Sequence, residues 1–228
     1  MSSESYDGSV PENRHYSQRV RAAAAEETRR RILDTAREGL RTSPSERISV
    51  ERVAHDAGVA RSTVYLIFGS KAGLFEALGH DLLQRTGFDK LVAAVQLPDA
   101  RDALCTAFAA AALMYAADRD VARAVYSMYA LDPDSVRGVF EVVEHGRAEG
   151  QRRLAQRLHD QGHLLEEVAV DEAADVLWLL TSFDAFDQLY TGRSLPAKQV
   201  GERLYRLAAR GLLRESGKHL RDGTRPGG

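Results

Sequence analysis

The sequence predicts an all-α protein in which a short helix-turn-helix domain precedes a larger helical domain. Apolar residues recur at helical spacing along almost all of the 228 residues, and no strand-like alternation persists. Residues 49–68 join two short stretches with this spacing through a glycine, as the two helices of a helix-turn-helix motif are joined. These observations predict about nine helices in total.

The first domain is expected at residues 21–75, after an N-terminal arm at residues 1–20 whose polar composition predicts disorder. Ser49 has the chemistry of a helix N-cap, and Gly58 is placed to end the helix that follows. The three helices of this domain are expected at about residues 22–40, 50–57 and 61–68.

The second domain is expected at residues 76–214, before a flexible, glycine-rich tail at 215–228. Its helices are separated by proline, glycine and aspartate, which break helices. The first of them begins just before the boundary, where Ser70 can cap it. The expected helices cover about residues 71–95, 100–117, 121–131, 135–160, 171–190 and 197–213.

Composition and charge exclude several classes of protein. One cysteine excludes a disulfide scaffold and a metal site of several thiolates. The longest near-apolar run, Ala103–Ala117, has 15 residues and is too short to cross a bilayer, and residues 1–10 lack the features of a secretory signal. We therefore expect a cytoplasmic protein without membrane contact.

Positive charge is concentrated in the first third of the chain. Residues 11–75 hold 12 basic and 8 acidic side chains, whereas residues 76–228 hold 19 basic and 23 acidic ones. A basic segment on an acidic remainder indicates that the first third contacts a polyanion. Because a balance of this size also suits solvated helix faces, the charge supports the motif and does not replace it.

The motif at residues 49–68 indicates DNA binding. Gly58 gives the turn its backbone freedom, and Val59 and Val64 are expected to bury between the two helices. The polar side chains of the second helix are then left outside, and a helix fits the major groove of DNA, where Arg reads guanine and hydroxyl groups contact bases or phosphates. The turn is Gly58, Val59 and Ala60, and the residues expected to contact DNA are Ser49, Arg61, Ser62, Thr63, Tyr65, Leu66 and Lys71.

Residues 28–78 resemble the N-terminal domain of the TetR (tetracycline repressor) family of bacterial transcription regulators. The resemblance implies a homodimer that binds a palindromic operator in double-stranded DNA and is released by a small-molecule effector. A repressor role is the favoured form of this function. The residues that carry the resemblance are Arg31-Ile32-Leu33, Ala36, Val53-Ala54, Ala57-Gly58-Val59, Thr63-Val64-Tyr65, Phe68, Ser70-Lys71 and Leu74.

Three departures from the family pattern bear on specificity. Ala60 stands where the family has a Ser or Thr cap, which forfeits about 1 kcal/mol. Leu66-Ile67 stands where the family often has an aromatic residue or histidine, although Leu66 can contact a thymine methyl group. The linker at residues 41–47 lacks the usual glycine.

The last two expected helices have two apolar faces each, so each needs two partners. One partner is the core of the domain, and the resemblance implies that the other is a second subunit, with the two helices of each subunit forming a four-helix bundle. The residues expected at this dimer interface are Trp178, Ser182, Ala185, Leu189, Leu204, Ala208 and Leu212.

The helix expected at residues 100–117 is rich in alanine, so it either allows close helix approach or leaves a cavity. A mostly apolar cavity with a few polar groups would suit a small-molecule effector. The family resemblance implies that effector binding shifts the helix expected at residues 71–95, and Gly79 and Gly87 would help that helix to bend. Core packing is the alternative role for each lining residue. The expected lining residues are Cys105, Phe108, Met114, Tyr126, Tyr129, Phe140 and Trp178.

No catalytic motif is present, so we expect no enzyme, no cofactor and no metal; His159 and His163 straddle a helix end and do not form a ligand pair. Two alternatives remain open. One is a regulator without a small-molecule effector. The other is a helical ligand-binding or adaptor protein whose DNA-reading domain is inactive, an alternative to which Ala60 and Leu66-Ile67 give weight.

Overall fold

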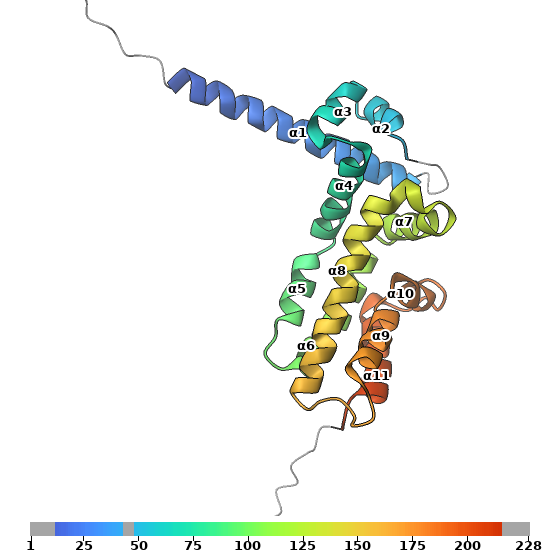
Figure 1. The fold of residues 1–228 in the computed structure, drawn as a ribbon. Coiled ribbons are helices and arrows are strands. Elements are labelled where there is room, and N and C mark those ends of the chain that lie inside the picture. Colours follow the sequence, from blue (N-terminus) through green and yellow to red (C-terminus); the bar gives the residue numbers. More distant parts are fainter. Residues whose placement is uncertain (1–11, 43–47, 216–228) are drawn as a thin grey trace, which may run out of the picture. The chain divides into compact units, whose positions relative to one another are not determined.

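The computed structural model describes residues 12–42 and 48–215 and confirms the predicted all-α class. Within these ranges no β-strand forms, and Leu164 and Leu213 make one isolated antiparallel bridge. The described residues form eleven helices, where about nine were predicted for the chain (Figure 1). The helices are α1 (Glu12–Thr42), α2 (Val50–Asp56), α3 (Arg61–Phe68), α4 (Lys71–Arg85), α5 (Phe88–Val95), α6 (Ala100–Ala117), α7 (Arg119–Leu131), α8 (Pro133–Asp160), α9 (Val170–Leu180), α10 (Phe183–Tyr190) and α11 (Ala197–Leu212).

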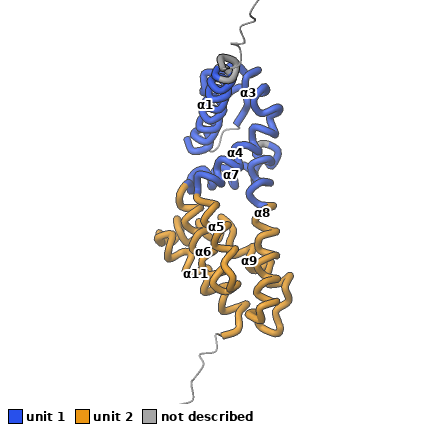
Figure 2. The backbone as a smooth tube through the Cα atoms, turned by 90° about the vertical axis from the view of Figure 1, so that its left-hand side faces the viewer, with its two compact units in different colours: residues 1–86, 118–144 blue, residues 87–117, 145–228 orange. Residues whose placement is uncertain are grey.

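The chain divides into two compact units, coloured in Figure 2. Unit one comprises residues 1–86 and 118–144, and unit two comprises residues 87–117 and 145–228. The expected boundary after residue 75 differs from this division, because α4, α7 and the start of α8 belong with the first three helices. No helix in the described part of the chain is long and apolar enough to cross a membrane.

Unit one is built around one apolar core. α1 contacts α2, α3, α4 and α7. The α7 residues Val121, Val125 and Met128 are buried in the same cluster as Ile32 of α1 and Val64 of α3. Helix α7 is therefore part of the support of the helix-turn-helix and not of the second unit.

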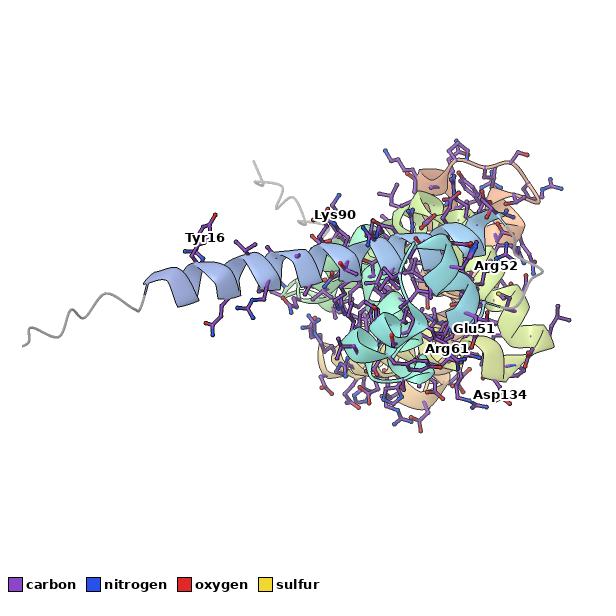
Figure 3. The ribbon with its side chains drawn as sticks, turned by 90° about the horizontal axis from the view of Figure 1, so that it is seen from above. Tyr16, Glu51, Arg52, Arg61, Lys90 and Asp134 are labelled. Carbon is purple, nitrogen blue, oxygen red and sulfur yellow. The ribbon has the colours of Figure 1, made fainter. Side chains whose placement is uncertain are left out.

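Helix α1 starts earlier than expected. It begins at Glu12, so residues 12–20 are helical, although the sequence predicts a disordered arm there. Four consecutive alanines at residues 22–25 have the highest helix propensity and extend the helix from its buried C-terminal half. Figure 3 shows Tyr16 near the end of this extension, where its side chain is exposed. The remainder of the expected arm, residues 1–11, lies outside the described residues, as do residues 43–47 of the linker and 216–228 of the tail.

Two helices that were predicted as continuous are broken. The predicted helix at residues 71–95 is split into α4 and α5 at Gly87, which has φ of +82°. The predicted helix at residues 171–190 is split into α9 and α10, where the hydroxyl of Ser182 accepts a hydrogen bond from the backbone N–H of Ala185 at 3.2 Å. These two breaks account for the difference between nine and eleven helices.

The start of α8 approaches α4 at backbone distance. A Cβ atom on Gly138 would lie 3.2 Å from both the Cβ of Phe75 and the backbone nitrogen of Glu76. A Cβ atom on Gly79 of α4 would lie 3.3 Å from the Cα of Val139. The two glycines therefore permit an approach that any side chain would widen.

In unit two, α6 packs against α11 at a crossing of small residues. Gly201 of α11 is buried, and a Cβ atom there would lie 2.9 Å from the carbonyl oxygen of Phe108 and 3.1 Å from the Cα of Ala109. The alanine-rich sequence of α6 thus serves close helix approach at this crossing, which is the first of the two roles expected from it.

The corner between α5 and α6 is held by side chains from the end of α8. Arg157 donates hydrogen bonds to the carbonyl oxygens of Val95, Leu97 and Pro98. The side-chain oxygen of Gln161 accepts a hydrogen bond from the backbone N–H of Ala100 at 2.7 Å, which caps the start of α6. These bonds satisfy backbone groups that the helix ends leave without partners.

Replacing Arg157 with alanine is expected to lower the free energy of unfolding by about 2 kcal/mol, because hydrogen bonds from a charged donor to the corner are lost. Chemical unfolding monitored by circular dichroism measures the change. Arg153→Ala is the matched control, since the exposed Arg153 side chain makes an ion pair with Glu149 on the same helix. A loss in the control as large as in Arg157→Ala would contradict a specific role for the corner.

Candidate nucleic-acid interface

The turn between α2 and α3 is built as the sequence predicts. Ser49 caps α2, and its hydroxyl accepts a hydrogen bond from the backbone N–H of Arg52 at 3.2 Å. Gly58 has φ of +64°, a left-handed conformation that glycine adopts without strain. The N–H of Val59 then donates to the carbonyl oxygen of Ala54 at 2.9 Å. The chain consequently leaves α2 and enters α3 through a short hydrogen-bonded turn.

Burial separates the two faces of α3. Val64 is buried with Val53 and Ala54 of α2, whereas Val59 is half-buried at the edge of the core. The last residue of α3 is held from α1, because the guanidinium of Arg29 lies 5.3 Å from the centre of the Phe68 ring. The inner face of α3 is thereby fixed, and its outer face is available to a partner.

The outer face carries polar groups and one apolar side chain. Arg61 and Ser62 are exposed, and Thr63 and Tyr65 are half-buried. Leu66 is 86% exposed. An exposed leucine contributes no hydrophobic stabilisation to its own domain, because its apolar surface stays in water. Arg61, Ser62 and Leu66 therefore lie at the surface, whereas Tyr65 also packs against the edge of the core.

Arg61 has two partners within the domain. Its Nη1 atom lies 2.9 Å from Oε1 of Glu51, and its Nη2 atom donates to the hydroxyl of Tyr65 at 3.2 Å. Its guanidinium carbon also lies 5.3 Å from the centre of the Tyr65 ring. The hydrogen bond to Tyr65 and then the charge of Glu51 raise the pKa of Arg61 above its ordinary value. Figure 3 labels Glu51 and Arg61.

Glu51 is absent from the residues expected at the interface. It lies in the first turn of α2, and Arg61 is the first residue of α3, ten positions later. The helix-turn-helix brings these two first turns together. The sequence signal that could have predicted the pair is therefore an acidic residue ten positions before the first residue of the second helix.

Lys71 lies at the start of α4, where Ser70 supplies the cap. The hydroxyl of Ser70 accepts a hydrogen bond from the N–H of Gly73 at 3.0 Å. Lys71 is exposed, and its ammonium lies 5.6 Å from the centre of the Phe75 ring. The pKa of Asp134 is lowered chiefly by its hydrogen bond with Arg137 and to a smaller extent by the charge of Lys71. Lys71 is thus a surface cation near the end of α3.

Ala60 occupies the N-cap position of α3 and makes no side-chain cap. Ser49 and Ser70 cap the helices on either side, so α3 is the one helix of these three without this hydrogen bond. The expected consequence of Ala60, a missing cap, is therefore confirmed.

The residues expected to line an effector pocket are divided between the two units. Tyr126, Tyr129 and Phe140 lie together in unit one. The ring of Phe140 stacks on Tyr129 with centroids 3.5 Å apart and meets Tyr126 edge-on at 5.5 Å. The hydroxyl of Tyr126 donates a hydrogen bond to Glu144. These three aromatic residues form one cluster with a carboxylate at its edge.

The other four residues of that set lie in unit two and do not share one environment. Phe108 is buried with its ring centroid 6.4 Å from that of Tyr205, and Met114 is also buried. Cys105 is exposed, and partial burial of its thiol raises its pKa. Trp178 is 45% exposed, and the guanidinium of Arg147 lies 4.7 Å from its ring centre.

The α11 residues expected at the dimer interface are buried within the single chain. Leu204, Ala208 and Leu212 are buried in the core of their own chain, because α11 turns this stripe and Gly201 towards α6. Ser182, Ala185 and Leu189 are half-buried, and Ser182 serves as the cap of α10. The large apolar side chains that unit two leaves exposed on α9 and α11 are Trp178, Leu179 and Leu207.

The two histidines that were considered as a metal pair have separate acidic neighbours. His159 lies 3.3 Å from Asp160, and His163 lies 3.2 Å from Asp99. Among the described residues, no group of three or more His, Cys, Asp or Glu side chains is placed to hold a metal ion.

Comparison with known proteins finds a family model that part of the chain matches. These residues match the family model described as bacterial regulatory proteins, tetR family. A comparison with curated proteins finds no match.

Several solved structures share the fold. NalD of Pseudomonas aeruginosa, the secondary repressor of the MexAB-OprM multidrug efflux pump, is 22% identical with a TM-score of 0.62, over 85% of this chain and 100% of that one. FadR of Bacillus halodurans, a fatty acid degradation regulator, is 18% identical with a TM-score of 0.62, over 82% and 97%. PfmR of Thermus thermophilus, a TetR family transcriptional regulator, is 20% identical with a TM-score of 0.57, over 80% and 99%.

Proposed function

We propose that this chain is a regulator of the TetR family, whose family model its residues 32–78 match, and that it acts as a repressor that binds a palindromic operator as a homodimer and leaves it when a small molecule binds. The observation that carries the proposal is the outer face of α3, where Arg61, Ser62 and Leu66 are exposed beside the hydrogen-bonded turn at Gly58. We place its action in the cytoplasm, where bacterial DNA lies.

The exposed groups of α3 match what the major groove offers. The groove is about 12 Å wide and admits a helix. Arg61 supplies two parallel N–H donors for the O6 and N7 atoms of guanine, and Leu66 supplies an apolar contact for a thymine methyl group. Lys71 supplies a positive charge to a phosphate at the edge of the groove. These roles divide the interface into base reading by α3 and positioning by the start of α4.

The proposed dimer surface lies on α9 and α11. These two helices contact each other, and they carry Trp178, Leu179 and Leu207, which are 45%, 61% and 55% exposed. Exposed large apolar side chains of this kind are typical of the core of a subunit interface. A two-fold axis through it would give two copies of α3, as an operator with two half-sites requires.

Replacing Leu207 with glutamate is expected to weaken the dimer by at least about tenfold, because two copies of an apolar contact are replaced by charges. Sedimentation velocity over a dilution series measures the change. Leu131→Glu is the matched control, since Leu131 is 87% exposed and lies in unit one. If both variants dissociate to the same extent, or if neither dissociates more than the wild type, Leu207 does not lie at the dimer interface.

The proposed effector is small and apolar or amphipathic. The cluster of Tyr126, Tyr129 and Phe140 supplies aromatic surface, and Glu144 supplies a polar group. Effector sites of this composition are mainly apolar with a few polar groups. Two of the proteins with this fold are a repressor of a multidrug efflux pump and a regulator of fatty acid degradation, and the first of them supports the repressor role.

Selection of bound duplexes from random DNA tests the function as a whole. The full chain is expected to enrich an inverted repeat whose half-sites are about 34–36 Å apart, or a multiple of that spacing. A pool without enrichment would support the alternative of a helical protein with an inactive reading domain. An enriched operator from which no apolar compound displaces the protein would support a regulator without a small-molecule effector.

A further inference from the structure

The ion pair between Glu51 and Arg61 places a negative charge on the surface that is proposed to bind DNA. The two side chains are 2.9 Å apart and are 56% and 58% exposed, so neither is committed to the core. An exposed pair of this kind contributes little to folding. Its position beside the reading face of α3 calls for a different account.

We propose that Glu51 is a specificity-determining residue that keeps Arg61 from binding phosphates and so weakens binding to random DNA. This inference rests on the proposed DNA-binding function and adds a residue that the reading helix itself does not contain. The carboxylate acts on Arg61 from α2, across the turn at Gly58.

Arg61 can read a base without leaving its partners. A guanidinium group has five N–H donors in a fixed plane. Glu51 takes a donor on Nη1 and Tyr65 takes a donor on Nη2, which leaves one further N–H on each of these nitrogens and one on Nε. The two partners hold the plane of the group, so less side-chain freedom is lost when the remaining donors meet a guanine.

A phosphate contact has different requirements. Binding to random DNA depends on phosphates, and a flexible arginine can reach them in many orientations. To do so here, Arg61 must move away from Glu51 and leave an unpaired carboxylate near the phosphate backbone. Like charges brought together in this way disfavour the wrong complex. The pair therefore penalises random DNA more than the operator.

The test is a double-mutant cycle of Glu51→Gln and Arg61→Ala in the full chain. Fluorescence anisotropy at fixed salt gives the affinity for the selected operator and for a random duplex of equal length, and their ratio is the readout. Glu51→Gln is expected to bind the random duplex about fivefold more tightly and the operator within about twofold, since the charge of one exposed pair is removed. In the Arg61→Ala background, Glu51→Gln is expected to leave the ratio unchanged.

Glu38→Gln is the matched control. Glu38 is also an exposed glutamate of unit one paired with an arginine, Arg41 at 2.8 Å, and its substitution changes the net charge by the same amount. Its ratio is expected to stay at the wild-type value. Glu51→Ala is a second variant, expected to reproduce the lower ratio, and thermal unfolding confirms that each variant is folded.

The outcomes separate this inference from the proposed function. A wild-type protein that binds the selected duplex no better than random DNA overturns the proposed function. If the wild-type protein does prefer the selected duplex, three results would overturn only the role of Glu51. These are a ratio unaltered by Glu51→Gln, a ratio lowered equally without Arg61, and a ratio lowered equally by Glu38→Gln.

Discussion

Replacing Arg61 with alanine is expected to weaken operator binding by about 30-fold to 20,000-fold. A bidentate contact between arginine and guanine contributes about 1–3 kcal/mol of discrimination, and a dimer makes the contact twice, which gives about 2–6 kcal/mol. Arg61 is exposed at the first position of α3, so its loss leaves the core of unit one intact. Anisotropy titrations of operator and random duplexes measure both the loss and its dependence on sequence.

Arg52→Ala is the matched control for loss of charge. Arg52 lies on α2, where its side chain is 47% exposed and 3.6 Å from Asp56. Its replacement removes the same formal charge without touching α3, so operator binding is expected to fall only a few-fold. If Arg61→Ala and Arg52→Ala weaken operator and random DNA to the same extent, Arg61 contacts phosphates and the base-reading role assigned to it is wrong.

The helix-turn-helix was the part of the molecule that could be predicted in most detail. The bounds of α3 agree with the prediction because Gly58 and Gly69 mark both sides of a short helix, and both glycines have positive φ. Ser49 and Ser70 act through local hydrogen bonds to the next turn, which need no tertiary information.

The breaks within the two long predicted helices were harder to foresee, because apolar spacing continues across them. At the second break, the hydroxyl of Thr181 donates to the carbonyl oxygen of Leu177 at 2.7 Å and that of Ser182 to Leu179 at 2.7 Å. Such side-chain bonds compete with the helical pattern. A Thr-Ser pair inside an apolar stretch was therefore the available signal.

Contacts between distant segments lay beyond periodicity altogether. Both faces of α11 are apolar, so spacing alone could not tell which face meets α6 and which remains exposed with Leu207. The partner of Arg61 posed the same difficulty, since Glu51 is on another helix. In each case the deciding quantity is a tertiary distance, which a single sequence does not contain.

The close approach of α11 to α6 makes Gly201 the position in unit two where a larger side chain should lower the stability most. Gly201→Val is expected to lower the free energy of unfolding by about 3 kcal/mol or more, because its Cβ alone would lie 2.9 Å from the carbonyl oxygen of Phe108 and the backbone of α6 cannot move aside locally. Gly201→Ala is expected to cost about 1 kcal/mol. Urea unfolding of both variants measures the series.

Gly150→Val is the matched control for this substitution. Gly150 lies in the interior of α8, in the same unit, and a Cβ atom there would meet nothing within 4 Å. Because valine has a somewhat better helix propensity than glycine, this variant is expected to be as stable as the wild type or slightly more stable. If Gly201→Val is as stable as Gly150→Val, α6 and α11 do not cross at backbone distance. That result would remove the basis for placing Leu204, Ala208 and Leu212 in the intrachain core. It would also remove the basis for choosing Leu207 for the dimer surface.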